Sequence, residues 1–167
     1  CAPIGLGTNT DPWQPAERRL GVTRAVLEVL ADCGHPVTIV TKSALILRDA
    51  DLLAAMAQRA LVHVTLTVTT LQADLARTLE PRAAAPHRRL QVIAALAGRG
   101  IPVAVSLGPV IAALADHEME SILQAAANAG ARSAIWLLLR LPLEVAPLFR
   151  DWLERHAPGR AKHVMSL

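Results

Sequence analysis

The chain has 167 residues, of which 53% are hydrophobic and 19% charged, with a formal net charge of +3 at pH 7. This composition excludes a disordered chain, and no apolar run approaches the roughly 18 residues needed to span a bilayer. We therefore expect no membrane partner. The start of the chain has no basic segment followed by a long apolar one, so we expect no signal peptide and a cytoplasmic location. The length fits residues 1–167 as one domain or a large piece of one.

The charged and sulfur-containing residues exclude several further classes. Arginines are spread along the chain, and there is no Tyr and only one Phe, so the pattern gives little support for a nucleic-acid-binding surface. Cys1 and Cys33 lie far apart and form no CxxC pair, which argues against a disulfide framework. The six histidines form no HxH or HExxH pair, so we expect no zinc site. We expect His117 to lie on a helix surface.

Five apolar, β-branched segments alternate with helical patterns along the chain. The predicted strands are Ile4–Gly7, Val37–Val40, Val62–Val68, Ile101–Ser106 and Ala134–Leu139. The predicted helices are Thr23–Asp32, Asp49–Arg59, Ala73–Leu79, Pro86–Ala97, Asp116–Ala129 and Glu144–Arg155. Gly34 and Gly130 follow helix ends, where glycine is favoured, and Asp116 is expected to cap the helix that it begins.

Apolar strands joined by helices predict a parallel sheet buried on both faces, with the strands in sequential order. Gly5 and Gly7 are followed by Thr8-Asn9-Thr10, so the dinucleotide-binding GxGxxG pattern is absent. An eight-unit α/β barrel needs about 250 residues, more than this chain has. We therefore predict an α/β fold, a partial parallel (β/α) barrel of five βα units. Its first strand would have an unpaired edge, which invites self-association.

In such sheets the reactive groups lie just beyond the carboxyl ends of the strands. Polar residues and prolines gather at these points: Thr8–Pro15, Thr41–Ser43, Thr69–Thr70 with Glu80–Arg82 further on, Gly108–Ile111 and Arg140–Pro142. The sequence therefore places a candidate site at this end of the sheet.

Each of these residues has a structural alternative. Asn9 and Asp11 either belong to the site or make Asx-turns. Lys42 follows an apolar strand directly, where its compact ammonium would hold a carboxylate or act as a Schiff-base amine; a structural lysine with a buried stem is the third interpretation. Glu80 and Arg82 either join the site or pair with each other on the surface.

Six segments also carry a resemblance to a known family. They are GTNTDPWQPAERRLGVTRAVLEVL (Gly7–Leu30), VTIVTKSALILRDADLL (Val37–Leu53), VTTL (Val68–Leu71), LEPRAAAPHRRLQVIAAL (Leu79–Leu96), GPVIAALADHE (Gly108–Glu118) and LLLRLPLEVAPLF (Leu137–Phe149). Together they resemble the radical S-adenosylmethionine superfamily, and within it the spore-photoproduct-lyase-like proteins of bacteria. The combination of TNTDPxQPxE, the TKS strand end and EPRAAxPxRRL carries the likeness, which covers nearly the whole chain.

The resemblance implies a partial (β/α)₆ barrel, of which the five predicted strands would be the second to the sixth. In that family a CxxxCxxC loop after the first strand holds a [4Fe–4S] cluster, and S-adenosylmethionine on the cluster yields a 5′-deoxyadenosyl radical. The CxxxCxxC motif is absent here. We infer that the first strand and the cluster loop lie upstream of Cys1. Residues 1–167 would then be a truncated core domain without metal ligands, inactive alone.

The resemblance also assigns residues to the cosubstrate. Thr8 and Asn9 would face its methionine moiety, Lys42 and Arg82 its carboxylate, and Thr67 and Thr69 its ribose or carboxylate. The segment Gly108, Pro109 and Val110 would hold the adenine.

The function expected from the resemblance is a radical S-adenosylmethionine enzyme core, with lyase or DNA-repair-like chemistry on a small molecule, peptide or nucleic acid that the sequence does not identify. Two alternatives stay open. One is a Schiff-base lyase that uses Lys42, and the other is a non-catalytic remnant that binds a nucleotide or a partner.

Overall fold

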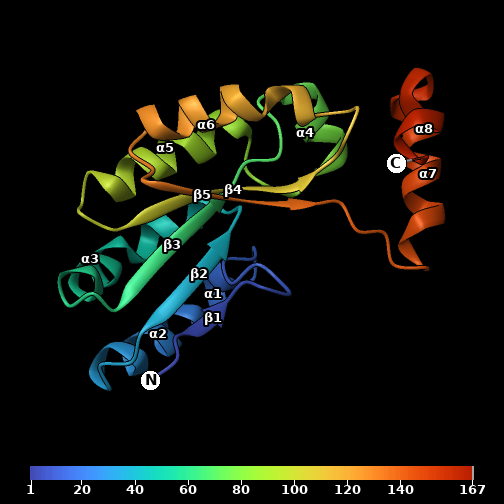
Figure 1. The fold of residues 1–167 in the computed structure, drawn as a ribbon. Helices are drawn as coiled ribbons and strands as arrows, with labels where there is room; N and C mark the ends of the chain where they lie inside the picture. Colours follow the sequence, from blue (N-terminus) through green and yellow to red (C-terminus); the bar gives the residue numbers. More distant parts are fainter. Residues whose placement is uncertain (167) are drawn as a thin grey trace.

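The computed structural model describes residues 1–166 as alternating strands and helices (Figure 1). The elements in chain order are β1 (Ile4–Leu6), α1 (Glu17–Leu20), α2 (Val22–Asp32), β2 (Val37–Thr41), the 3₁₀ helix η1 (Ala44–Asp49), α3 (Ala50–Gln58), β3 (Val62–Thr67), α4 (Ala73–Leu79), α5 (Pro86–Ala97), β4 (Val103–Val110), the 3₁₀ helix η2 (Asp116–Glu118), α6 (Met119–Asn128), β5 (Ser133–Leu138), α7 (Val145–His156) and α8 (Pro158–Val164). No helix in residues 1–166 is both long enough and apolar enough to cross a membrane.

The five strands form one parallel sheet in the order β1-β2-β3-β4-β5. This confirms the predicted direction and order of the strands, and it leaves β1 at one edge and β5 at the other. The curved, open sheet is consistent with a partial α/β barrel. All five carboxyl ends therefore meet at one rim, where the candidate site was expected.

The main core lies between the sheet and one layer of helices (Figure 1). Since paired residues of parallel strands project to the same face, the register places Ile39 and Val64 together on the helix side, with no exposed surface. The opposite face carries small or polar residues instead, for example Thr65 beside Ala104 and Thr67 beside Ser106. This polar face is unlike the bulky apolar interior of an eight-unit barrel.

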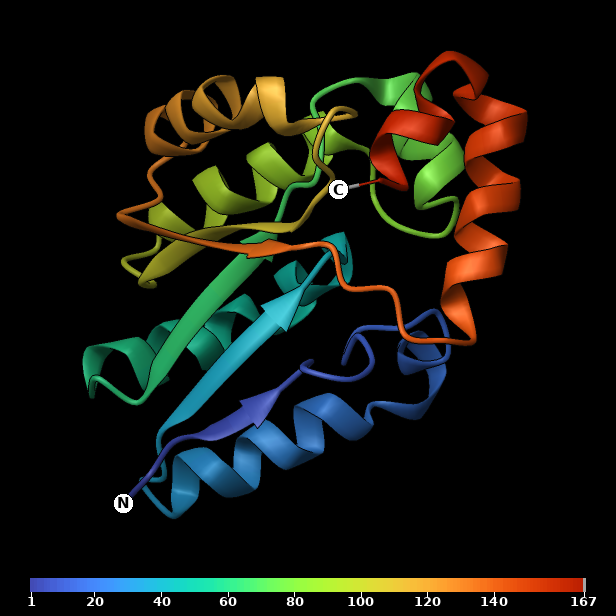
Figure 2. The same cartoon turned by 45° about the vertical axis from the view of Figure 1, so that its right-hand side comes forward.

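The prediction that every strand is buried on both faces is wrong at the two edges. All six residues of β5 are exposed, and β1 is exposed at Ile4 and Gly5. The reason is the position of the last helices. Leu153 of α7 packs with Ile111 and Leu114 in a separate small cluster, and Figure 2 shows α7 and α8 beside α4, at the carboxyl ends of the strands. The helix-side face of β5 is left bare.

The structure confirms some of the helix ends and caps predicted from the sequence, but not all of them. Gly34 and Gly130 follow α2 and α6 with positive φ, as predicted. The predicted cap at Asp116 is wrong, because the residue before η2 is Ala115 and no side-chain cap bond forms there. The helices α1 and α8 and the 3₁₀ helix η1 were not predicted.

Candidate functional site

The loop after β1 is held against the end of β2 by a close backbone approach. Gly7 has φ 88°, and a Cβ at this position would lie 1.9 Å from the main-chain oxygen of Val40. Only glycine fits both conditions. The carboxylate of Asp11 then accepts from the Thr41 hydroxyl at 2.8 Å, from the Lys42 backbone N–H at 2.8 Å and from the Trp13 N–H at 2.9 Å. The last bond is an Asx-turn, so that interpretation of Asp11 is confirmed.

A buried carboxylate anchors the same loop from its other side. The Trp13 indole N–H donates to Asp49 Oδ2 at 2.8 Å, and Arg48 donates to both oxygens of Asp49, at 2.7 and 2.9 Å. Burial alone would raise the pKa of Asp49, but the bonds from Arg48, Trp13 and Arg24 hold this pKa below its ordinary value. The carboxylate is therefore ionised at neutral pH and fixes the position of Trp13.

An ion cluster joins the ends of β2 and β3 to α5. Glu80 forms a salt bridge with Lys42, accepts from the Thr69 hydroxyl at 3.1 Å and accepts from Arg89 at 2.6 Å. The Arg89 side chain is 2% exposed and also donates to the main-chain oxygens of Thr67 and Ala84, at 3.0 and 2.6 Å. One carboxylate thus faces two cations, which leaves the cluster with one positive charge in excess.

The two cations change the ionisation of Glu80. Burial alone would raise the pKa of this carboxyl, but the charges of Arg89 and Lys42, with the bonds that they donate, keep its pKa below the ordinary value. Glu80 therefore stays charged at neutral pH, and it holds the Lys42 ammonium in place at the end of β2.

A cavity of about 630 Å³ opens beside the cluster. Its charged lining consists of three cations, Arg18, Lys42 and Arg82, and one acid, Asp11. Arg18 and Arg82 are exposed, and within residues 1–166 neither forms a salt bridge. Of the two interpretations of Glu80 and Arg82, the surface pair between them is wrong, because Glu80 binds Lys42 and Arg89 instead. This arrangement suits an anionic ligand.

The other predicted site residues fall into two groups. Thr67 and Thr69 are buried and belong to the ion cluster, through the Thr67 carbonyl and the Thr69 hydroxyl. Thr8 and Asn9 are exposed on the loop after β1 and do not line the cavity. Gly108, Pro109 and Val110 form the last part of β4, with a cis bond between Gly108 and Pro109, and they also lie outside the cavity lining. Of the nine predicted residues, Lys42 and Arg82 thus line the cavity and Thr67 and Thr69 bond to the ion cluster beside it, whereas the other five do neither.

One organising residue was not recognised from the sequence alone. Arg89 was not singled out at all, whereas Glu80 was a candidate whose partner was left open. Arg89 lies in the segment LEPRAAAPHRRL, and its signal was its place on the face of α5 that also carries Val92 and Ile93. A charged residue at a core position of a helix requires a buried counter-ion.

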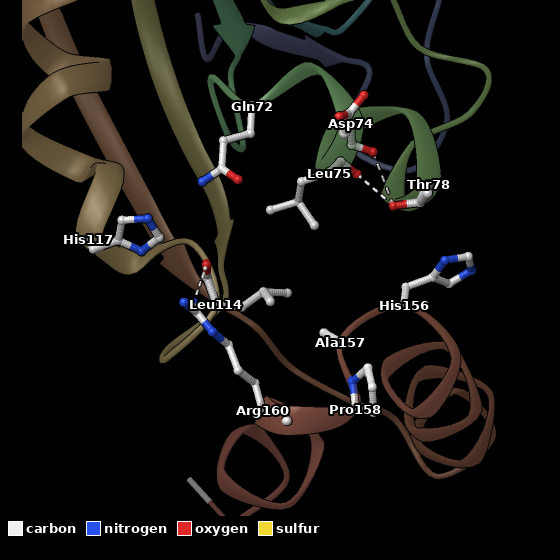
Figure 3. Close-up of a pocket in the computed structure, with 11 residues that line it drawn as sticks. Gln72, Asp74, Leu75, Thr78, Leu114, His117, His156, Ala157, Pro158 and Arg160 are labelled. Atoms are coloured by element: carbon white, nitrogen blue, oxygen red, sulfur yellow. Dashed lines mark hydrogen bonds between the residues drawn. The ribbon is translucent and has the colours of Figure 1, made fainter.

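A second cavity, of about 520 Å³, lies between α4, the loop after β4 and the turn from α7 to α8 (Figure 3). Several of its polar groups are already engaged: Thr78 donates to the main-chain oxygen of Leu75, and Arg160 donates to that of Ala113. His117 and His156 line it from opposite sides. His117 is exposed on η2, as expected from the sequence. This cavity has no excess of charge comparable to that around Lys42.

The cysteines do not fit an iron–sulfur cluster. Cys1 and Cys33 are both free and exposed, and such a cluster needs three or four thiolates in one place. Within residues 1–166 no group of three or more His, Cys, Asp and Glu side chains could hold a metal ion.

Comparison with known proteins adds relatives of unassigned activity. An uncharacterized protein of Mycobacterium tuberculosis and one of Mycobacterium bovis are each 34% identical over 157 residues, covering 93% of this chain and 46% of the relative. An uncharacterized protein of Methanocaldococcus jannaschii is 29% identical over 115 residues, covering 69% of this chain and 43% of the relative. The chain thus spans about half the length of the curated relatives that it matches. No family model matches the chain.

Proposed function

We propose that the chain is the cosubstrate-binding core of a radical S-adenosylmethionine enzyme, with Lys42 as the group that receives the cosubstrate carboxylate. The observation that carries this proposal is the cationic cavity at the rim of the parallel sheet, next to the Lys42–Glu80–Arg89 cluster. Its excess positive charge suits a carboxylate, and its volume lies in the range of small-molecule sites, about 300–1,000 Å³.

In this proposal the residues of the chain bind and orient, and S-adenosylmethionine supplies the radical chemistry. Glu80 positions the Lys42 ammonium, and Arg82 offers a second donor in the lining of the cavity. Because Cys1 and Cys33 do not fit a [4Fe–4S] cluster, the proposal assigns the cluster ligands to polypeptide outside residues 1–167. The substrate class, lyase or DNA-repair chemistry included, stays open, since a shared core says little about substrate.

The Schiff-base alternative is less well supported by the surroundings of Lys42. A nucleophilic lysine has to lose its proton, and enzymes achieve this by burying the amine or placing it near another cation. Here Lys42 instead forms a salt bridge with the carboxylate of Glu80, and its side chain is 35% exposed. Neither feature matches the buried or cation-paired setting of a Schiff-base lysine.

The proposal is tested by titrating two ligands into the wild type and Lys42→Ala by calorimetry: S-adenosylhomocysteine, which carries the amino acid part with its carboxylate, and 5′-methylthioadenosine, which lacks that part. Loss of a charged hydrogen bond costs about 1.5–3 kcal/mol, so we expect Lys42→Ala to bind S-adenosylhomocysteine about 10- to 150-fold more weakly. Affinity for 5′-methylthioadenosine, which lacks the carboxylate, should stay unchanged.

Lys162→Ala is the matched control, because Lys162 is the other lysine of the chain and is exposed on α8. Equal affinities of Lys42→Ala and Lys162→Ala for S-adenosylhomocysteine would remove Lys42 from the site. Trapping of a carbonyl compound on Lys42 by borohydride would favour the Schiff-base lyase. A wild type that binds neither ligand would reject the cosubstrate site.

A further inference from the structure

The β5 edge of the sheet has an unpaired row of backbone groups. β5 pairs with β4 on one side, and within residues 1–166 no strand pairs with its other side. The Leu139 N–H donates to the Val110 oxygen, and Val110 is paired with Leu138, so alternate residues back along the strand from Leu139 turn toward β4. Ala134, Trp136 and Leu138 therefore direct their N–H and C=O groups outward, where a further strand would bind them.

The exposed apolar side chains of β5 favour association of this edge with another strand. Trp136 and Leu137 are each 60% exposed, Ile135 and Leu138 are also exposed, and the segment from Ser133 to Leu139 has no charged residue. Proteins usually protect an edge with charges, prolines or a very short strand. β5 has none of these protections.

The strand at the opposite edge, β1, differs from β5 in its length and in the residues that protect it. β1 is three residues long, contains Gly5 and follows Pro3. A short strand with glycine and a neighbouring proline is a poor template for pairing. The β5 edge is therefore a better template for strand pairing than the β1 edge, where the sequence led us to expect pairing.

Two arginines at the ends of β5 determine which charges a strand that pairs with this edge can carry at its own ends. Arg132 and Arg140 flank the apolar strand, both are exposed, and neither forms a salt bridge within residues 1–166. A second copy paired antiparallel would bring Arg132 of each molecule beside Arg140 of the other, at both ends of the new ladder. Like charges in such cross-strand positions are destabilising, whereas acidic residues would be attracted.

We propose that the β5 edge binds a polypeptide strand with an apolar centre and an acidic residue at each end, by strand addition to the sheet. The outward backbone groups of Ala134, Trp136 and Leu138 supply the ladder, the exposed side chains of β5 supply apolar contact, and Arg132 and Arg140 select the ends. The same arginines disfavour a second copy of this chain. Figure 2 shows β5 running to the rim before the chain turns toward α7.

The test uses two fluorescent synthetic peptides with the same centre of six alternating Val and Thr residues, one with Glu and one with Lys at both ends. Anisotropy titrations at low salt should show at least tenfold tighter binding of the Glu-ended peptide. The double variant Arg132→Glu, Arg140→Glu should reverse this preference. Both positions are exposed, so the swap tests selectivity without disturbing the core.

A second pair of variants tests the ladder. Trp136→Pro removes an outward N–H, and Trp136→Ala keeps it while removing the same apolar contact. We expect Trp136→Pro to bind the Glu-ended peptide at least tenfold more weakly than Trp136→Ala, with circular dichroism verifying that both variants are folded. Equal binding of the two peptides, an unchanged preference in the charge-swapped variant, or no binding at all would overturn the proposal. A stable wild-type dimer that Trp136→Pro dissociates would identify a second copy as the occupant and would also overturn it.

Discussion

Glu80 should be the residue whose charge contributes most to stability around the candidate site. Its side chain is 10% exposed and that of Arg89 is 2% exposed, so Glu80→Gln leaves a buried guanidinium without its counter-ion. Breaking a buried ion pair from one side costs about 3–5 kcal/mol. Because the amide oxygen introduced by this substitution could still accept one hydrogen bond, we expect a loss near the lower limit, about 3 kcal/mol. With a urea slope of about 2–3 kcal/mol/M for a chain of this size, the unfolding midpoint should fall by about 1–1.5 M.

The acid dependence of this loss follows from the lowered pKa of Glu80. A carboxylate with a depressed pKa stabilises the folded chain above the ordinary pKa of about 4.3, and this contribution disappears as the pH falls through the folded-state pKa. The difference between wild type and Glu80→Gln should therefore be constant from pH 7 to about 5 and shrink at lower pH. Urea unfolding followed by far-ultraviolet circular dichroism at several pH values measures it.

Asp74→Asn is the control for Glu80→Gln, because it removes one partner of an exposed pair with Arg77. An exposed pair contributes little, so this variant should lose less than about 1 kcal/mol. If Glu80→Gln is no less stable than Asp74→Asn at pH 7, the reasoning that Glu80 neutralises a buried charge is refuted.

Two further substitutions test how the loop after β1 is held. Gly7→Ala places a Cβ 1.9 Å from the Val40 oxygen at a positive φ, so it should lower the free energy of unfolding by at least about 3 kcal/mol. The control is Gly21→Ala, which is also at positive φ but has nothing within 4 Å of its Cβ, and it should cost only about 1 kcal/mol. Comparable melting temperatures would contradict the close approach. Asp49→Asn should cost about 2–3 kcal/mol, because Asp49 binds Trp13 and Arg48 in the interior. Asp51→Asn, which loses only surface bonds to Arg24, should change the urea midpoint little, and equal losses would show that burial of Asp49 is unimportant.

The order and direction of the strands could be predicted because they depend on local sequence and on chain connectivity. Each apolar segment is strand-sized, and the intervening helices require parallel crossovers. Two helices, α4 and α5, have the predicted boundaries, Ala73–Leu79 and Pro86–Ala97. Here the helical periodicity coincides with clear end signals, Pro86 at a helix start and Gly98 after the last turn.

The exposure of β5 could not be predicted, because burial depends on neighbours and not on the strand itself. Ala134–Leu139 is as apolar as a central strand, and only the position of α7 leaves it bare. The partner of Glu80 was missed for a similar reason. Arg82 is two residues away in sequence, whereas Arg89 reaches Glu80 because the chain folds back between α4 and α5.

The small cluster of Ile111, Leu114 and Leu153 also bears on how the chain opens. It is separate from the main core, so α7 and α8 contribute little to the packing of the sheet. One hydrogen bond, from the Trp152 indole to the Thr78 oxygen, links α7 to α4, and Arg160 links α8 to the loop after β4. The free energy needed to unfold a region locally is lower than that of global unfolding when the region has few buried contacts. We therefore expect the last 20 or so residues to open as a unit of their own while the sheet and the Lys42 cluster remain folded.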